Sequence, residues 1–275
     1  MTARPRVLIT GATSGLGRAV AARLAADGYR VVAHGRDPRK VEQTVAELGA
    51  GAEPEVADLA SLGATVELAE RVAAGGRLDV LVNNAGVGFG PPGGGRQVSR
   101  DGHELRMAVN YLAPVALTRA LLPLLRESAP SRVVNVGSVG QVPFDPDDLE
   151  FRTGYDGVAA YRRAKLALAA YTFDLAEELR GTGVTVNCLH PASLMPTAMI
   201  LESRVSPLSS LAQGVAATLR LITDPALAGT TGEFYDGTER SRARPQAYDQ
   251  EFRRRLRRST EALLDPVLHG RARAE

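Results

Sequence analysis

Short apolar segments alternate along the chain with longer segments whose apolar residues recur at helical spacing. The runs that predict strands are Val7–Thr10, Arg30–Ala33, Val80–Asn83, Ser131–Val136, Val184–Leu189 and, more weakly, Glu233–Tyr235. The helical patterns between them are Arg18–Ala26, Arg39–Leu48, Ser61–Ala74, Asp101–Leu125 and Tyr155–Arg180. Strands that are apolar on both faces and separated by helices indicate a parallel sheet covered on both sides. We therefore expect an α/β fold built on one doubly wound parallel sheet.

The length and the lack of internal division favour a single domain. A chain of 275 residues can bury one large core, and no repeat or linker interrupts it. The glycine- and proline-rich stretch Gly86–Gly95 is too short to separate domains and predicts a surface loop. We expect a domain over residues 1–240 that binds cofactor and carries the chemistry, and a C-terminal extension over residues 241–275.

Composition excludes several other kinds of protein. With one cysteine, Cys188, the chain has no intrachain disulfide, and its four histidines lack the spacing of zinc ligands. The formal net charge is only +2, so we expect no nucleic-acid partner. No apolar leader precedes the first strand, and the apolar stretch Ala108–Leu125 contains Asn110 and Pro114, which favours a buried helix over a membrane span. We expect no metal, no membrane contact and a cytoplasmic location.

A glycine-rich turn joins the first strand to the first helix. The segment Gly11-Ala-Thr-Ser-Gly15-Leu-Gly17 follows Val7–Thr10 directly, with glycines spaced as G-x₃-G-x-G. Glycine permits a sharp turn and close approach to a pyrophosphate, while the helix N-terminus offers free N–H groups and a positive dipole end. We interpret this turn as a dinucleotide-phosphate site formed by Gly11, Thr13, Ser14, Gly15, Leu16 and Gly17.

A basic residue follows the second strand. In dinucleotide-binding folds an acidic residue at this place binds the ribose 2′-hydroxyl, whereas arginine pairs with a 2′-phosphate. Here Gly35 stands where the acid is expected, and the guanidinium of Arg36 suits bidentate contact with phosphate. Of the 33 cationic side chains, all but Lys40 and Lys165 are arginines. Because arginine is so frequent in this chain, the alternative interpretation is that Arg36 is a solvated surface residue. The sequence favours NADP(H) over NAD(H).

Four polar residues further along form a candidate catalytic set. Tyr161 and Lys165 are four residues apart and therefore share one face of a helix. A phenol with a pKa near 10 is a poor acid–base group at neutral pH, and a neighbouring ammonium lowers that pKa. We expect Tyr161 to transfer the proton, Lys165 to assist it, Ser138 to bind the substrate oxygen and Asn110 to hold a water that links Lys165 to solvent.

These motifs in this order resemble the short-chain dehydrogenase/reductase superfamily, classical type, over roughly residues 5–240. They are T-G-x₃-G-x-G, N-N-A-G from Asn83, Asn110, Ser138 and Y-x₃-K. The resemblance implies a Rossmann-type fold, a nicotinamide cofactor and the four catalytic roles given above, with Lys165 also a ribose ligand. The cofactor residues it implies, besides the glycine turn, are Arg36, Asp58, Leu59, Asn84, Ala85, Gly86, Tyr161, Lys165, Pro191, Leu194 and Thr197.

Two features resemble the retinol-dehydrogenase-like branch of that superfamily. Ser138 and Tyr161 are 23 positions apart, and the insertion between them carries the acidic segment Phe144–Leu149. The segment His190–Thr197 resembles the part that closes over the nicotinamide, with Ala192 where glycine is usual. The residues we expect to contact substrate are Ser138, Gln141, Tyr155, Met195 and Met199.

The resemblance also bears on assembly. It implies a homodimer or homotetramer that uses the long helices around Asp101–Leu125 and Tyr155–Arg180. The basic run Arg253–Arg258 predicts a solvated helix face, with an anion or nucleic-acid site as the alternative.

The function these residues predict is an NADP(H)-dependent oxidoreductase that interconverts a carbonyl and an alcohol by hydride transfer. Its expected partner is a small molecule, a bulky apolar carbonyl compound or other secondary metabolite. One alternative is an epimerase or dehydratase that uses the same tyrosine and lysine. The other is a catalytically silent NADP(H)-sensing or scaffold protein on the same fold.

Overall fold

An eight-stranded sheet forms the centre of the molecule. The computed structural model describes residues 4–91, 93–196, 206 and 208–268. The strand order is β3-β2-β1-β4-β5-β6-β7-β8, with β1 to β7 parallel and only β8 antiparallel to its neighbour. The order reverses between β1 and β4, which is where open α/β sheets bind their ligands. The predicted doubly wound, Rossmann-type sheet is confirmed.

The elements have the following bounds. The strands are β1 (Arg6–Ile9), β2 (Arg30–Gly35), β3 (Glu53–Val56), β4 (Val80–Asn83), β5 (Ser131–Val136), β6 (Val184–His190), β7 (Phe234–Asp236) and β8 (Glu239–Ser241). The helices are α1 (Gly15–Ala26), α2 (Pro38–Leu48), α3 (Leu62–Ala74), α4 (Leu105–Met107), α5 (Ala113–Glu127), α6 (Gly157–Glu178), α8 (Leu211–Thr223) and α9 (Gln250–Leu268).

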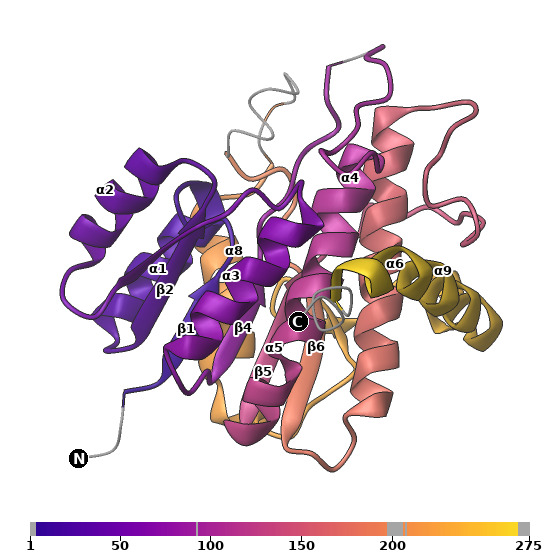
Figure 1. Ribbon diagram of the computed structural model, residues 1–275. Coiled ribbons are helices and arrows are strands. Elements are labelled where there is room, and N and C mark those ends of the chain that lie inside the picture. The colour runs from indigo at the N-terminus through magenta and orange to yellow at the C-terminus, as the bar shows by residue number, and fades with distance from the viewer. Residues whose placement is uncertain (1–3, 92, 197–205, 207, 269–275) are drawn as a thin grey trace.

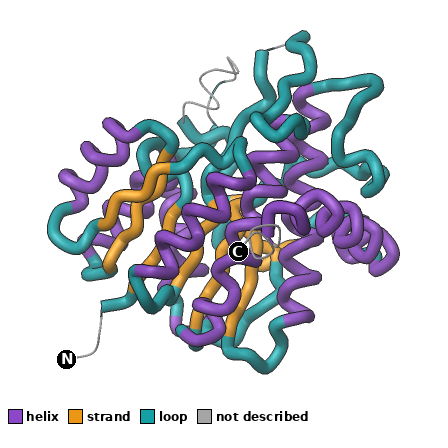
Figure 2. Tube along the Cα trace, viewed as in Figure 1, coloured by secondary structure: helices purple, strands orange, loops and turns teal. Residues whose placement is uncertain are grey.

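Helices cover both faces of the sheet. In Figure 1, α3, α5 and α6 lie in front of the strands and α1 and α8 behind them, and Figure 2 shows the strands enclosed between the two layers. Each layer buries its own apolar cluster, the larger one under α3, α5 and α6 and the smaller one under α1 and α8. Central strands such as β1 and β4 are buried along their whole length, as their continuous apolar sequences predict.

Two strands were not predicted because their sequences carry little apolar signal. In β3 the sequence is Glu53-Pro-Glu-Val, with alternating half-buried and exposed positions at the edge of the sheet. Proline and charge are tolerated at an edge strand. Glu53 accepts hydrogen bonds from Arg6 and Arg30, which fixes this edge electrostatically. The short β8 and helix α8 also lie outside the predicted elements.

The segment predicted as one helix over Asp101–Leu125 is divided. It begins as α4, passes through a π-helical turn at Ala108–Leu112 and continues as α5. Pro114 has no N–H to donate to the carbonyl of Asn110, so the regular pattern of helical hydrogen bonds cannot run through this point. Such π-turns are frequent at functional sites.

The same stretch is the one described segment long and apolar enough to be a candidate membrane span. It runs over Leu105–Glu127, and 78% of its most apolar window is buried inside the fold. The structure therefore places this segment in the core of the fold, as a buried helix, which is what the sequence predicts for Ala108–Leu125.

The C-terminal extension packs onto the front layer. Helix α9 crosses α3, α5 and α6 and buries Phe252, Leu256 and Leu264. The Tyr111 hydroxyl and Thr260 Oγ1 are 2.7 Å apart across this contact. The boundary expected at residue 240 falls within β8, and α9 partly covers the two long helices for which an intersubunit contact was predicted.

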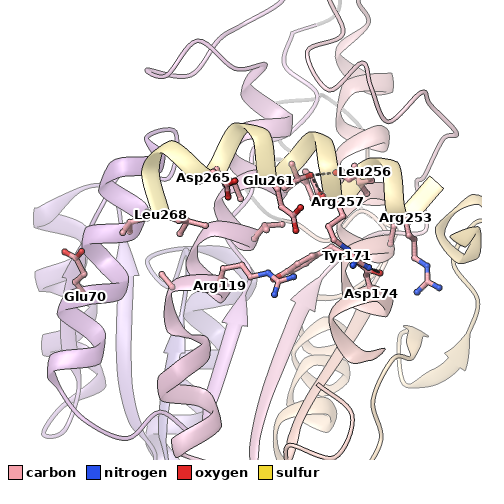
Figure 3. A pocket seen from close by; sticks show the side chains of 17 residues that line it. Glu70, Arg119, Tyr171, Asp174, Arg253, Leu256, Arg257, Glu261, Asp265 and Leu268 are labelled. Atoms are coloured by element: carbon pink, nitrogen blue, oxygen red, sulfur yellow. Dashed lines mark hydrogen bonds and ion pairs between the residues drawn. The ribbon is translucent and has the colours of Figure 1, made fainter. Parts of the chain in front are cut away.

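The basic run in α9 is largely paired with acids of the same chain. Arg253 binds Glu177 and Arg257 binds Asp174, both on α6, while Arg255 binds Asp145 and Asp147 in the insertion before Tyr161. Figure 3 shows α9 above α5 and α6, with Arg119, Tyr171 and Asp174 below it, around a cavity of about 530 Å³. Through these ion pairs the basic run attaches α9 to α6 and to the insertion, so it is not the wholly solvated helix face that the sequence predicts.

Candidate active site

A cavity of about 610 Å³ opens at the carboxyl ends of the parallel strands. It gathers the turns that follow β1, β2, β3, β4, β5 and β6, together with the first half of α6. Its lining includes these residues predicted to bind cofactor or substrate: Gly11, Thr13, Ser14, Gly15, Leu16, Gly17, Arg36, Asp58, Leu59, Asn84, Ala85, Gly86, Ser138, Tyr161, Lys165, Pro191, Leu194 and Met195. Segments far apart in sequence therefore meet in one site.

The glycine turn is packed so closely that side chains are excluded. Gly11 has a φ of 68°, a conformation that glycine adopts freely. A Cβ on Gly17 would lie 2.3 Å from the Gly11 carbonyl oxygen and 2.4 Å from Asn84 Nδ2. Asn84 Nδ2 in turn donates to the carbonyl of Thr10 at 2.8 Å. The turn is a bare backbone surface that a pyrophosphate could approach.

Helix α1 begins at this surface without a side-chain cap. Ser14 is its N-cap and makes no capping hydrogen bond, whereas Asp37, Ser61 and Asp156 cap α2, α3 and α6 with their side chains. The first N–H groups of a helix need partners, and an uncapped N-terminus facing a cavity suits an anion. The residues present therefore fit the diphosphate of a dinucleotide cofactor.

His34 supports the glycine turn from the neighbouring strand. Its Nδ1 accepts from the N–H of Gly11 at 3.3 Å, and its Nε2 lies 3.1 Å from the carbonyl oxygen of Ala57. The two contacts require a neutral ring with the proton on Nε2. Burial lowers the pKa of His34 to about 4. No sequence motif indicates a function for His34, apart from its position directly before Gly35.

This geometry predicts a loss of stability on mild acidification. Because the pKa of His34 is about 4 in the folded chain and 6.5 when exposed, the unfolded chain binds a proton first as pH falls. The free energy of unfolding should fall by about 3 kcal/mol between pH 6.5 and pH 4 from this group. Urea titrations across that range should show a shallower fall in a His34→Gln variant. An equal fall in both proteins would contradict this assignment.

The end of β2 presents an unpaired cation. Arg36 is exposed at the cavity edge and has no ion-pair partner among the residues that the structure describes. A Cβ on Gly35 would lie 2.5 Å from Thr13 Cγ2, so an acidic side chain at that position would collide with the glycine turn. Leu59 and Asp58 line the same region, and Asp58 accepts from the N–H of Ala60 at 3.0 Å.

Ser138 and Tyr161 meet on the opposite side of the cavity. Ser138 follows β5, is 8% exposed and accepts from the N–H of Gly140 at 3.0 Å. Burial raises the pKa of the Tyr161 hydroxyl, and a hydrogen bond with Ser138 opposes that rise. The phenol is therefore held in its protonated form at neutral pH, which suits a proton donor.

Lys165 lies one helical turn beyond Tyr161 and is 4% exposed. Its Nζ is 5.7 Å from the centre of the Tyr161 ring and donates to the carbonyl of Val136 at 2.7 Å. Burial lowers the pKa of Lys165 to about 8. The sequence predicts that this ammonium lowers the pKa of Tyr161, whereas burial raises that pKa and only the hydrogen bond with Ser138 opposes the rise.

Asn110 lies in the π-helical turn and is buried beside the cavity rather than among its lining residues. Its side-chain amide binds both backbone groups of Val87, accepting at 2.8 Å and donating at 3.0 Å. In the protein Asn110 thus fixes the loop after β4. The predicted role of holding a water stays a prediction.

The other predicted substrate residues fall in different places. Gln141 and Tyr155 lie outside the cavity lining. The Gln141 amide donates to the Ser138 carbonyl at 2.7 Å and accepts from the N–H of Arg244 at 2.9 Å. Thr197 and Met199 are outside the described residues.

Leu194, rather than Ala192, has the left-handed conformation in the turn after β6, with a φ of 47°.

Several lining residues were not predicted from the sequence. Phe89 has its ring centre 4.8 Å from that of Tyr161 at an interplanar angle of 82°, and Val139 is exposed at the cavity mouth. His190 lines the cavity and its Nε2 lies 3.0 Å from Ser193 Oγ. Phe89 belongs to the glycine-rich loop, where sequence offers no periodicity to show which side chains face inward.

A cavity at the switch point of a parallel sheet, lined by an uncapped helix N-terminus and by a half-buried tyrosine next to a buried serine and a buried lysine, defines a dinucleotide-binding oxidoreductase. The short chain dehydrogenase family model matches residues 5–206, and the chain belongs to that family. Its sequence is 35% identical to human retinol dehydrogenase 14 over 91% of this chain and 83% of that protein. The resemblance to the retinol-dehydrogenase-like branch is confirmed.

Two solved structures from the family show the same fold with different cofactors. The 3-ketoacyl-(acyl-carrier-protein) reductase from Brucella melitensis, complexed with NADH, has a TM-score of 0.68 and 25% identity over 84% of this chain and 96% of that one. RhlG from Pseudomonas aeruginosa, complexed with NADP, has a TM-score of 0.69 and 29% identity over 86% and 95%. The fold alone therefore does not decide between the two nucleotides.

Proposed function

We propose that this protein is an NADP(H)-dependent oxidoreductase that reduces the carbonyl group of a bulky apolar molecule to an alcohol. The observation that carries the proposal is the pair formed by buried Ser138 and half-buried Tyr161 in the same cavity as the uncapped start of α1. One end of the cavity suits the phosphates of a dinucleotide and the other offers a proton donor. When bound, NADP(H) would supply or accept the hydride.

The side chains of the chain carry the rest of the chemistry. Ser138 would donate a hydrogen bond to the substrate oxygen, and Tyr161 would deliver its hydroxyl proton to that oxygen as negative charge develops there. The raised pKa of Tyr161 keeps the proton on the phenol until it is needed. Lys165, anchored on Val136, would hold a ribose hydroxyl and stabilise the phenolate that remains.

The preference for NADP(H) is supported at the end of β2. Gly35 leaves no room for an acidic side chain that would bind a ribose 2′-hydroxyl, and Arg36 has its guanidinium free of ion pairs within the described chain. A fixed positive charge near the adenosine ribose favours a 2′-phosphate. NADP pools are kept largely reduced in cells, which favours the reductive direction.

The apolar wall of the cavity supports the substrate class. It includes Phe89, which contacts Tyr161, together with Val139, Leu194 and Met195, and such a wall favours an apolar compound with few polar groups beside its carbonyl. From the sequence we also expect that the protein is cytoplasmic and that it forms a homo-oligomer.

The experiment is carbonyl-dependent oxidation of NADPH, followed by absorbance with a panel of aldehydes, ketones and quinones. We expect turnover with apolar ketones or aldehydes and a lower rate with NADH. Tight binding of NADPH without oxidation by any member of the panel would favour the sensing alternative. Product without net consumption of NADPH would favour the epimerase.

A further inference from the structure

Arg106 is a buried cation whose whole guanidinium is used to hold a loop of the cavity. Its side chain is 3% exposed, and each of its five N–H donors has a partner. Nε donates to the Gly88 carbonyl at 3.1 Å and Nη2 to the Phe89 carbonyl at 3.1 Å. The remaining acceptors are Gln97 Oε1 at 2.8 Å, the Tyr155 hydroxyl at 2.9 Å and Glu104 Oε1 at 3.4 Å.

Glu104 completes this cluster and ties it to the fold. It is 1% exposed, and its Oε2 accepts from the N–H of Met107 at 2.7 Å at the start of α4. Its Oε1 accepts from the Tyr155 hydroxyl at 2.9 Å. A buried ion pair adds little net stability compared with apolar residues, but it can fix one arrangement of the chain. Here the arrangement fixed is that of residues 88 and 89.

The loop is close-packed at this point. A Cβ on Gly157, the first residue of α6, would lie 2.2 Å from the Phe89 carbonyl oxygen. A Cβ on Gly90 would lie 2.3 Å from Arg106 Nη2. The backbone of Phe89 is therefore held between Arg106 and the start of the helix that carries Tyr161, and its side chain has a defined direction.

That direction brings the Phe89 ring against the Tyr161 ring. The centroids are 4.8 Å apart at an angle of 82°, an edge-to-face arrangement, and the half-buried Phe89 side chain also lines the cavity. A substrate oxygen within reach of the Tyr161 hydroxyl brings the neighbouring carbon substituents close to this aromatic wall. A flat apolar substituent can stack there, while a small aliphatic one gains little.

We propose that Phe89 determines substrate specificity by selecting carbonyl compounds with a flat, apolar group next to the reacting carbon, and that Arg106 is the positioning residue that holds Phe89 in place. This inference rests on the proposed function and narrows its substrate class. Phe89 would contact the carbonyl substrate, Arg106 acts through Phe89, and neither residue contacts the region predicted to bind the phosphates.

The first test compares two ketones, acetophenone and acetone, in a Phe89→Leu variant. Leucine keeps an apolar side chain but removes the aromatic face, so kcat/KM for acetophenone should fall about tenfold. The value for acetone should fall much less than that for acetophenone, and the Kd for NADPH should change less than twofold. The matched control is Phe144→Leu, which removes a ring that contacts Phe252 instead of Tyr161. Equal losses for both ketones, or none, would overturn the assignment of Phe89.

The second test asks whether Arg106 acts through Phe89. Arg106→Lys keeps a charge beside Glu104, but one ammonium cannot replace the forked contacts to two carbonyls. We expect the same selective loss for acetophenone, and a double variant no worse than either single one. Additive losses would overturn the role given to Arg106. If the melting temperature shows that Arg106→Lys does not fold, Gly90→Ala disturbs the same contact from the exposed side of the loop.

A binding measurement separates this inference from the proposed function. Calorimetry can measure acetophenone binding to the protein saturated with NADP⁺, where no reduction takes place. Weaker binding by about tenfold in Phe89→Leu supports the aromatic wall even if the protein reduces no carbonyl, which would contradict the function alone. Unchanged binding overturns the specificity role of Phe89 whatever the turnover.

Discussion

Replacing Tyr161 by phenylalanine is expected to lower kcat/KM for carbonyl reduction by about a thousandfold, because a positioned general acid contributes on the order of 10²–10⁴ to rate. The substitution removes only the hydroxyl that shares a hydrogen bond with Ser138. The ring itself, with its contact to Phe89, is kept, so the cavity should retain its shape. Steady-state kinetics with a saturating ketone measures the loss, and fluorescence titration should give an unchanged Kd for NADPH.

The matched control is Tyr171→Phe on the same helix. Tyr171 is buried between α5, α6 and α9. It lines the cavity under α9 and not the active-site cavity, so removing its hydroxyl should leave kcat/KM within about twofold. Retention of activity in Tyr161→Phe would contradict the assignment of the proton donor. A loss of NADPH binding together with activity would show instead that the variant fails to bind its cofactor.

Replacing Arg36 by aspartate is expected to change the ratio of kcat/KM for NADPH over that for NADH by about a hundredfold in favour of NADH. A charge-assisted contact with phosphate contributes about 1.5–3 kcal/mol, and each 1.4 kcal/mol is a factor of ten. The introduced carboxylate would also repel a 2′-phosphate and could accept from a ribose hydroxyl. Initial rates with each nucleotide at a fixed ketone concentration measure the change.

Arg39→Asp provides the control for this experiment. Arg39 is exposed in the first turn of α2, close in sequence to Arg36 but outside the cavity lining. The same change of charge should alter the ratio less than threefold, since exposed charges at a distance are screened. Equal effects of the two substitutions would indicate a general electrostatic preference, and no effect of Arg36→Asp would contradict the role given to that residue.

Much of the fold could be predicted because the buried strands carry an unambiguous signal. In β1, β4 and β5 both faces are buried, and their apolar runs show this directly. The edge strand β3 could not be found in the same way, because its glutamates pair with Arg6, Arg30 and Arg71 and its sequence carries no apolar run. The break at Ala108–Leu112 escaped prediction for a different reason, since a π-turn keeps the apolar spacing of a helix.

The candidate site could be predicted where chemistry restricts the residue type. Only glycine fits at Gly17, and only a short list of groups can act as Ser138, Tyr161 and Lys165 do in the proposal. Residues that act through packing were missed. Phe89 reaches Tyr161 because Arg106, 17 positions later, holds its backbone, and no local sequence pattern shows such a contact. The motif Y-x₃-K predicts a lowered pKa for Tyr161, whereas burial raises it, and burial cannot be read from the motif alone.

The central claim is that this cavity transfers a hydride from a bound nicotinamide to a carbonyl carbon while Tyr161 supplies the proton. The most direct measurement uses NADPH deuterated at the transferable position with an apolar ketone, followed by mass spectrometry of the alcohol. We expect one deuterium, on the carbon that bears the new hydroxyl, and labelled product formed about a thousandfold more slowly with Tyr161→Phe. Alcohol without deuterium, or tightly bound NADPH that forms no alcohol with any ketone or aldehyde, would contradict it.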